Sequence, residues 1–322
     1  MGYKAGETIL DDQYNNFVAS SSSPYGINHI FGTGSLQYGL GQTALAQTSA
    51  GTTISASQWN SLFSAMNNVA NHTNDSITST TSRSAGDPIA VISALQGDLN
   101  TLAASVAAGC PNATALSTSA TLVTSNSSTR WAGSHVVEQS TTFSDANHMR
   151  WFFNAGGKIQ INLSRLGNGG SSATSKDTSF DQLISAIGTF LIKSQTSTRS
   201  GSGETVSTNG LANGFYDLGT GYTTLLRLTQ DSGTYTSNYI QIEAKLNAAP
   251  GTATVITVKT SLVDADGGDG TFTSGNTSGV DQYANFVGQT SVILKNVDPT
   301  TAEGLSQVYT RSGAAQVTNT TA

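Results

Sequence analysis

Beyond residue 130 the sequence is a succession of short segments in which apolar and polar residues alternate, separated by turns rich in Asp, Gly, Asn and Ser. The clearest segment is 158–164, where Ile159, Ile161 and Leu163 alternate with polar residues, as in a half-buried strand. With 149–153 before it and Asn-Ala-Gly-Gly between, it predicts a hairpin. Further strands are predicted at 190–195, 222–229, 239–247, 253–263, 291–297 and 305–311.

A helix is predicted between these strands, because Phe180, Leu183 and Ile187 fall on one helical face together with Ile184. The strand spacing favours an antiparallel sandwich. The predicted fold is therefore mainly β. It consists of an antiparallel sandwich-like C-terminal domain with one packed helix, plus a smaller α-helical and extended N-terminal region.

Small hydroxyl residues dominate the composition, with 43 Ser and 45 Thr among 322 residues. Charged residues are only 11%, against about 25% in typical soluble domains. Disorder usually combines low hydrophobicity with high net charge, whereas 37% of this chain is apolar and patterned. Because β-branched Thr suits exposed strands, the composition favours a folded β protein with Thr-covered sheet faces.

The N-terminal third has a different pattern. Thr8 and Asp11 resemble a capping box, which predicts a short helix over about 8–19. Residues 20–53 lack strong periodicity and are predicted to form an extended arm. Its isolated aromatics are expected to insert into a neighbouring subunit; they are Tyr25, Phe31 and Tyr38.

The next helix has the strongest local signals. Ser55 and Gln58 form a capping box pattern, and an apolar stripe follows at helical spacing. The stripe consists of Trp59, Leu62, Phe63, Met66 and Val69. The opposite face is polar but uncharged, which favours packing against another polar protein surface; it carries Asn60, Ser61, Asn67, Asn68 and Asn71.

A third helix is predicted from Asp87-Pro88 to about Ala108, ending at Gly109. Its apolar residues repeat at spacings of 3 and 4, which is compatible either with a short coiled coil between identical chains or with packing on its own domain. These residues are Ile92, Leu95, Leu99, Leu102 and Val106.

The predicted division of the chain has four parts. Residues 1–53 form the arm with one short helix, and 54–111 a helical anchoring and oligomerisation region. A linker spans 112–130, and the β-sandwich-like domain spans 131–322.

Signatures of catalysis and of common ligands are missing from the sequence. It contains no nucleophile elbow, P-loop or dinucleotide fingerprint. The four histidines fall in different segments, and the one cysteine excludes an internal disulfide; these residues are His29, His72, His135, His148 and Cys110. We therefore predict no enzyme, no catalytic, cofactor-binding or metal residue, and no cofactor.

Charge and hydropathy limit the partners. The net charge of −6 provides no basic field for nucleic acid, so no nucleic-acid partner is expected. No apolar run approaches the roughly 18 residues of a membrane span, and the N-terminus lacks a secretory signal pattern. We expect synthesis in a host cytoplasm without membrane insertion.

Two groups of residues allow a binding role or a structural one. Asp264, Asp266 and Asp269 lie in a Gly-rich segment that is either a turn between strands or a cation site, although Gly275 stands where a calcium loop places its bidentate Glu. Four tyrosines either stack on sugars or pack across strands. They are Tyr222, Tyr235, Tyr239 and Tyr283.

Several stretches resemble virion structural proteins of tailed bacteriophages, which are tail-fibre-like or tail-associated. These stretches are 6–15 (GETILDDQYN), 51–62 (GTTISASQWNSL), 151–159 (WFFNAGGKI) and 214–218 (GFYDL). The closest resemblance is to proteins of marine and cyanobacterial myoviruses. It implies a structural protein that is located in the virion and has no catalytic residues.

The resemblance implies a tail-associated part, namely a short fibre, an adaptor or a tail-tip component. Its partners would be other copies of itself in a trimer, other virion proteins, and a host surface glycan or receptor. The alternatives are a capsid decoration or head-fibre protein, a receptor- or glycan-binding module and, least favoured, a polysaccharide depolymerase. Whether the protein is located on the tail or on the capsid is left open.

Overall fold

Two compact units make up the computed structural model. The first comprises Met1–Thr118, Asp145–Gly157 and Asp298–Thr310, and the second comprises Ser119–Ser144, Lys158–Val297 and Arg311–Ala322. The structure describes residues 11–78, 80–87, 92–117, 120–128, 130–131, 133–166, 175–233, 235–265, 286–300, 305–306 and 308–321. The β domain predicted over 131–322 is therefore divided, because residues 145–157 and 298–310 belong to the first unit.

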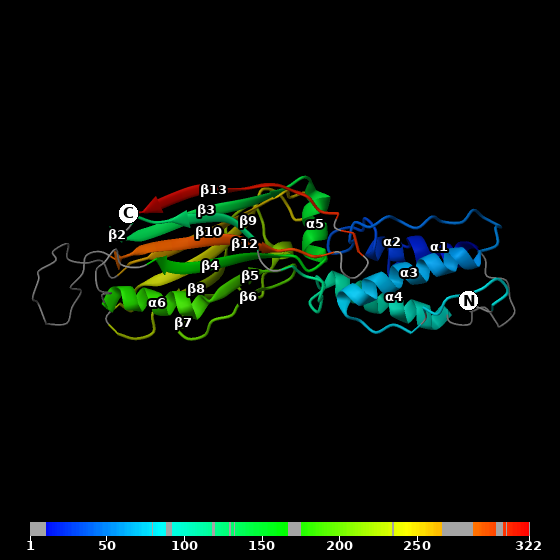
Figure 1. Ribbon diagram of the computed structural model, residues 1–322, viewed down its shortest axis with the longest axis horizontal. Helices are drawn as coiled ribbons and strands as arrows, with labels where there is room; N and C mark the ends of the chain where they lie inside the picture. Colours follow the sequence, from blue (N-terminus) through cyan, green and yellow to red (C-terminus); the bar gives the residue numbers. More distant parts are fainter. Residues whose placement is uncertain are drawn as a thin grey trace, which may run out of the picture. The chain divides into compact units, whose positions relative to one another are not determined.

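The first unit is helical. Its long helices α3 and α4 contact each other and run side by side (Figure 1). The helices of this unit are α1 (Asp11–Ala19), α2 (Ile27–Ile30), α3 (Ala56–Thr73), α4 (Ile92–Ala107) and α5 (Ala146–Asn154).

Helix α3 forms where its local signals predict. Ser55 Oγ accepts a hydrogen bond from the Gln58 backbone N–H at 3.3 Å, and Gln58 Oε1 accepts one from the Ser55 N–H at 2.8 Å. This confirms the capping box. The whole predicted apolar stripe is buried, and the helix ends before Asn74, whose φ of 57° lies in the left-handed region.

The apolar stripe of α4 is buried inside its own unit. Leu95, Leu99, Leu102 and Val106 are fully buried in one hydrophobic core with residues of α1 and α3. Packing on its own domain is therefore the reading that the structure bears out. The coiled-coil reading, in which this stripe is the seam between identical chains, is wrong for these four residues.

Residues 20–53 pack on the core of the first unit instead of extending from it as an arm. Phe31 is buried in the core of the same unit, and Tyr25 stacks on His29 with ring centroids 4.5 Å apart. Asn28 holds the later part of the segment, because its side chain bonds both the N–H and the C=O of Leu45. The prediction that Phe31 inserts into another subunit is therefore wrong, whereas Tyr25 and Tyr38 are only partly buried against the same core, and their insertion stays a prediction.

The second unit contains two antiparallel sheets within its described residues, which confirms the mainly β fold class (Figure 1). The five-stranded sheet has the order β1 (Ala120–Asn126), β12 (Gln289–Val297), β4 (Lys158–Leu166), β5 (Thr189–Ile192) and β6 (Ser197–Arg199). The six-stranded sheet has the order β13 (Arg311–Thr321), β3 (Ser134–Phe143), β10 (Val255–Val263), β9 (Tyr239–Leu246), β8 (Thr223–Thr229) and β7 (Thr205–Asn209).

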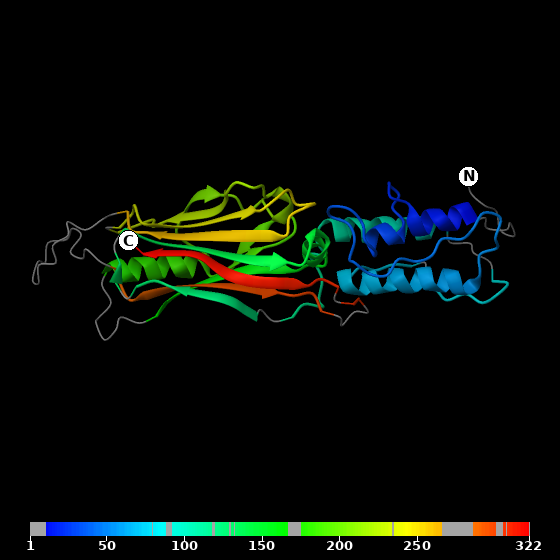
Figure 2. The same ribbon diagram turned by 90° about the horizontal axis from the view of Figure 1, so that it is seen from above.

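The predicted helix of this unit, α6 (Ser175–Ile187), contacts both sheets. It packs against β4 of one sheet and against β8 and β9 of the other (Figure 2). Phe180, Leu183 and Ile187 are buried on the face that the sequence predicts. Two short elements complete the unit: a ladder between β2 (Arg130–Trp131) and β11 (Phe286–Val287), and a 3-10 helix, η1 (Phe215–Asp217).

One half of the predicted hairpin is a helix. Residues 149–153 belong to α5 because Asp145 caps the turn, accepting from the N–H groups of Asn147 at 2.8 Å and His148 at 3.0 Å. Met149, Phe152 and Phe153 then fall on one buried helical face. The other half, β4, is a strand as predicted.

Two further boundaries differ from the predictions. Residues 112–130 are not a plain linker, because β1 lies within them and pairs antiparallel with β12. Residues 305–306 and 308–310 form no strand, and the last strand begins at Arg311 and pairs with β3. The missed strands β1 and β13 are polar and largely exposed, so they carry little of the alternation that identifies a half-buried strand.

Candidate functional site

No catalytic or metal-binding cluster emerges from the part of the chain that the structure describes. Among those residues, no group of three or more His, Cys, Asp or Glu is placed to hold a metal ion. Cys110 is buried just after α4, and burial raises the pKa of its thiol. None of the described helices has the length and apolar character needed to cross a membrane.

The four histidines have separate local contacts. His72 bonds the Ala155 carbonyl at 2.8 Å, and His29 stacks on Tyr25. His135 lies between Thr290 and Asn319, at 2.7 Å and 2.9 Å. All of these contacts hold protein segments together.

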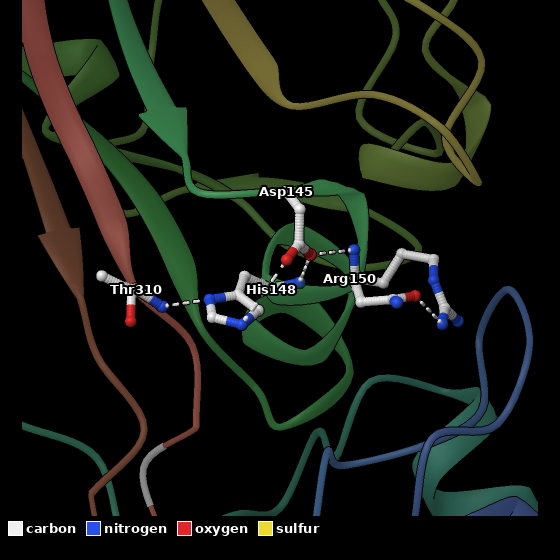
Figure 3. A network of polar contacts seen from close by, with 5 residues as sticks. Asp145, His148, Arg150 and Thr310 are labelled. Atoms are coloured by element: carbon white, nitrogen blue, oxygen red, sulfur yellow. Dashed lines mark hydrogen bonds and ion pairs between the residues drawn. The ribbon is translucent and has the colours of Figure 1, made fainter.

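A polar network surrounds the start of α5 (Figure 3). His148 Nδ1 accepts a hydrogen bond from the Thr310 N–H at 2.9 Å, and its Nε2 lies 3.7 Å from the Asp145 carboxylate. Arg150, which is 4% exposed, donates to the carbonyls of Leu36 at 2.8 Å and Thr33 at 3.2 Å. Asp145, His148 and Arg150 each hydrogen-bond backbone groups of the same unit, so these contacts hold its segments together.

The acidic segment is only partly described. The Asp264 carboxylate is paired with Lys176 at 2.7 Å, and both side chains are fully buried. Asp266 and Asp269, together with Gly275, lie outside the described residues. The carboxylate of Asp264 thus contacts an internal cation.

The tyrosines proposed for sugar stacking already have partners in this chain. Tyr235 is buried, and the guanidinium of Arg227 lies 3.6 Å from the ring centre of Tyr239. The ammonium groups of Lys245 and Lys259 lie 4.2 Å and 4.3 Å from the Tyr222 ring centre. Tyr283 lies outside the described residues.

Tyr222 and its neighbours form a compact charged group beside the six-stranded sheet. Lys259 on β10 pairs with Glu243 on β9 at 2.6 Å. Burial, together with the negative charge of the Glu138 carboxylate, raises the pKa of Tyr222, so the phenol stays protonated. This group ties neighbouring strands together and leaves little aromatic face for a ligand.

The outer strands of the six-stranded sheet form the strongest candidate surface, which we call the edge surface. It has two separate parts, β7 at one edge of the sheet and β13 at the opposite edge. Strand β7 is uncharged and exposed at every position, and β13 is mostly exposed and carries one charge, Arg311. Val206 on β7 and Val317 on β13 are 39% and 52% exposed. Exposed, weakly charged edges with apolar side chains are surfaces to which another strand can pair.

Strand β13 also has features that control such pairing. Its pairing with β3 shifts register twice, between Arg311 and Gly313 and between Gln316 and Thr318. Irregularities of this kind bend an edge and limit where another strand can add. At its far end, Asn319 donates to the Asn126 carbonyl of β1 at 2.8 Å. Val317 lies at the second of these register shifts, and its side chain is exposed.

His135 contacts β13 through its hydrogen bond with Asn319, and we expect the stability of this contact to depend on pH. Burial is the main cause that lowers the pKa of His135 below its ordinary value. The unfolded chain binds the proton near pH 6.5, whereas the folded chain binds it only at lower pH. The contribution of His135 to the free energy of unfolding is therefore complete above about pH 6.5. It is lost as the pH falls through the pKa that His135 has in the folded chain.

We expect the free energy of unfolding to fall between about pH 8 and about pH 5, and the variant His135→Gln to show a smaller fall. Urea unfolding at several pH values, followed by circular dichroism, measures both slopes. His148→Gln is the control, because this side chain is partly exposed and not held between two sheets. Equal slopes for His135→Gln and the unmodified chain would contradict the assignment.

Comparison with protein-family models matches no family, and comparisons with curated proteins and with solved structures find no significant match.

Proposed function

We propose that this chain is a structural component of a tailed-phage virion, tail-associated as a short fibre, adaptor or tail-tip part, and assembled with other copies of itself in a trimer. The association of identical chains is proposed from the edge surface, because its valines are exposed and it has almost no charged residues. The sequence resemblance to virion structural proteins supports the phage part.

The internal use of polar groups favours a structural role over a catalytic or sugar-binding one. Where the described residues bring Asp, His and Arg together, at α5, these groups bond backbone. The Tyr222 and Tyr239 rings are in contact with cations of the same chain. Both arrangements stiffen the protein, which is what a particle component requires.

The edge surface has a direct test in the substitution Val317→Lys. An unpaired ammonium placed on an edge strand opposes strand addition, so we expect the association of identical chains to weaken by about tenfold or more. Val206→Lys applies the same change to β7. Sedimentation analysis of each purified full chain across a concentration series measures the effect.

Leu166→Lys is the matched control. Leu166 is 50% exposed, like Val317, but it lies on β4, an interior strand of the other sheet. We expect this variant to assemble as the unmodified chain does. Equal assembly of all three variants would remove the edge surface from the proposal, and a monomeric unmodified chain would remove self-assembly itself.

The position on the particle is tested by the number of copies. A tail-associated trimer predicts a small copy number in multiples of three, whereas a capsid decoration protein predicts a number set by capsid symmetry. Quantitative mass spectrometry of purified particles, calibrated with a known capsid protein, distinguishes the two. A copy number that matches the capsid lattice would overturn the tail assignment.

A further inference from the structure

One ion pair in the second unit differs from the other ion pairs of the described residues in its complete burial. Lys176 Nζ lies 2.7 Å from Asp264 Oδ2, and both side chains are 0% exposed. In the Lys259–Glu243 pair the two side chains are 24% and 12% exposed. A fully buried lysine is rare, because removing its charge from water is costly.

The two residues are held in place by different elements. Lys176 lies in the first turn of α6, and Asp264 directly follows the end of β10. The Asp264 N–H donates to the Gly133 carbonyl at 2.8 Å, which fixes the backbone beside the carboxylate. The residues are 88 positions apart in the chain, so their approach is made by the fold.

Buried aromatic rings lie beside the lysine of this pair. The ring centre of Tyr235 lies 5.4 Å from Lys176 Nζ, and this tyrosine is 5% exposed. Phe180, one helical turn after Lys176, is fully buried and packs edge-on against Trp131 with centroids 5.4 Å apart. Both charged groups are thus held away from bulk water, which is costly unless they are paired with each other.

We propose that Lys176 and Asp264 condense to form an intramolecular isopeptide bond. A proton passes from the Lys176 ammonium to the Asp264 carboxylate, which gives a neutral amine beside a carboxylic acid. The amine nitrogen attacks Cγ, a C–N bond forms and one C–O bond breaks. The oxygen leaves as water with two protons, so ammonium and carboxylate become one amide and one water without a further reactant.

Burial and position account for the selection of this pair. The nucleophile and the carbonyl carbon are held together before reaction, which replaces a costly encounter by an intramolecular step. The complete burial of both side chains keeps bulk water away from the leaving oxygen. Lys259 and Glu243 are as close, with 2.6 Å between Nζ and Oε2, but they retain solvent exposure and stay an ion pair.

Intact mass spectrometry of the purified full chain tests the bond. We expect a mass lower than that of the sequence by one water, and a peptide digest containing a branched product that joins the Lys176 and Asp264 peptides. A chain at the full sequence mass, with these two residues recovered in separate peptides, would overturn the proposal. This outcome does not depend on whether any variant folds.

Two variants test whether the missing mass of one water comes from a bond between Lys176 and Asp264. Lys176→Arg keeps the positive charge but removes the amine nucleophile, so its mass is expected to match its own sequence without loss of water. Lys259→Arg is the matched control and should still lack one water. Loss of water in Lys176→Arg would place the reaction elsewhere and contradict the assignment. The result is independent of virion assembly, since a monomer can form the bond.

Discussion

Trp59→Ala is expected to lower the free energy of unfolding of the first unit by about 3–5 kcal/mol, the range for removing a buried tryptophan. Trp59 is 1% exposed and lies at the centre of the aromatic core of this unit. Its ring centroid is 5.5 Å from that of Tyr14, 5.9 Å from Phe63 and 6.2 Å from Phe17. The substitution therefore separates α1 from α3 and leaves a cavity between them.

Urea unfolding followed by the helical circular dichroism signal measures this loss. Ser64→Ala is the control, because Ser64 is exposed on the same helix and its replacement is expected to change stability by no more than about 0.5 kcal/mol. A loss below about 1 kcal/mol for Trp59→Ala would mean that the contacts of α1 with α3 do not hold this unit together.

Arg150→Ala is expected to cost about 2–4 kcal/mol, because hydrogen bonds from a charged donor contribute more than neutral ones. The buried guanidinium donates to the carbonyls of Leu36 and Tyr38 and to the side chain of Asn147. Asn154 donates to the carbonyls of Leu36, Tyr38 and Gly39 at 2.9 to 3.1 Å. Together these two side chains of α5 hold residues 33–39 in place.

Arg150→Lys separates the charge from the geometry of the guanidinium. A lysine keeps the positive charge but cannot form the same forked set of bonds, so we expect it to recover only part of the loss. Limited proteolysis gives a local measurement, with faster cleavage expected within 33–39 in Arg150→Ala than in Arg150→Lys. Unchanged cleavage in both variants would show that Arg150 does not hold this segment.

Local patterns predicted the elements whose apolar residues follow one period. Helix α3 combines a capping box with a regular stripe, and β9 and β10 alternate clearly, so their positions agree closely with the predictions. Helix α5 was misassigned because Trp151, Phe152 and Phe153 are favourable strand residues, and the cap at Asp145 decides their conformation. Strand β3 was missed because it buries polar groups, including His135 and Gln139.

The contacts that define the candidate sites could not be read from local sequence. Lys176 and Asp264 are 88 residues apart, and no periodicity links them. The edge surface depends on strand order, because β7 and β13 become edges only through the way the sheet is assembled. The coiled-coil reading of α4 failed for a related reason, since a heptad stripe does not specify whether its partner is another chain or the same one.

The assignment to a virion is decided by the distribution of this chain in infected cells that express it. Particles are purified through a density gradient, and peptides from both units are quantified by mass spectrometry in the particle and free-protein fractions. We predict that the chain co-purifies with the particles at a fixed number of copies and stays there after a high-salt wash. Recovery only in the free-protein fraction would contradict a structural role in the virion.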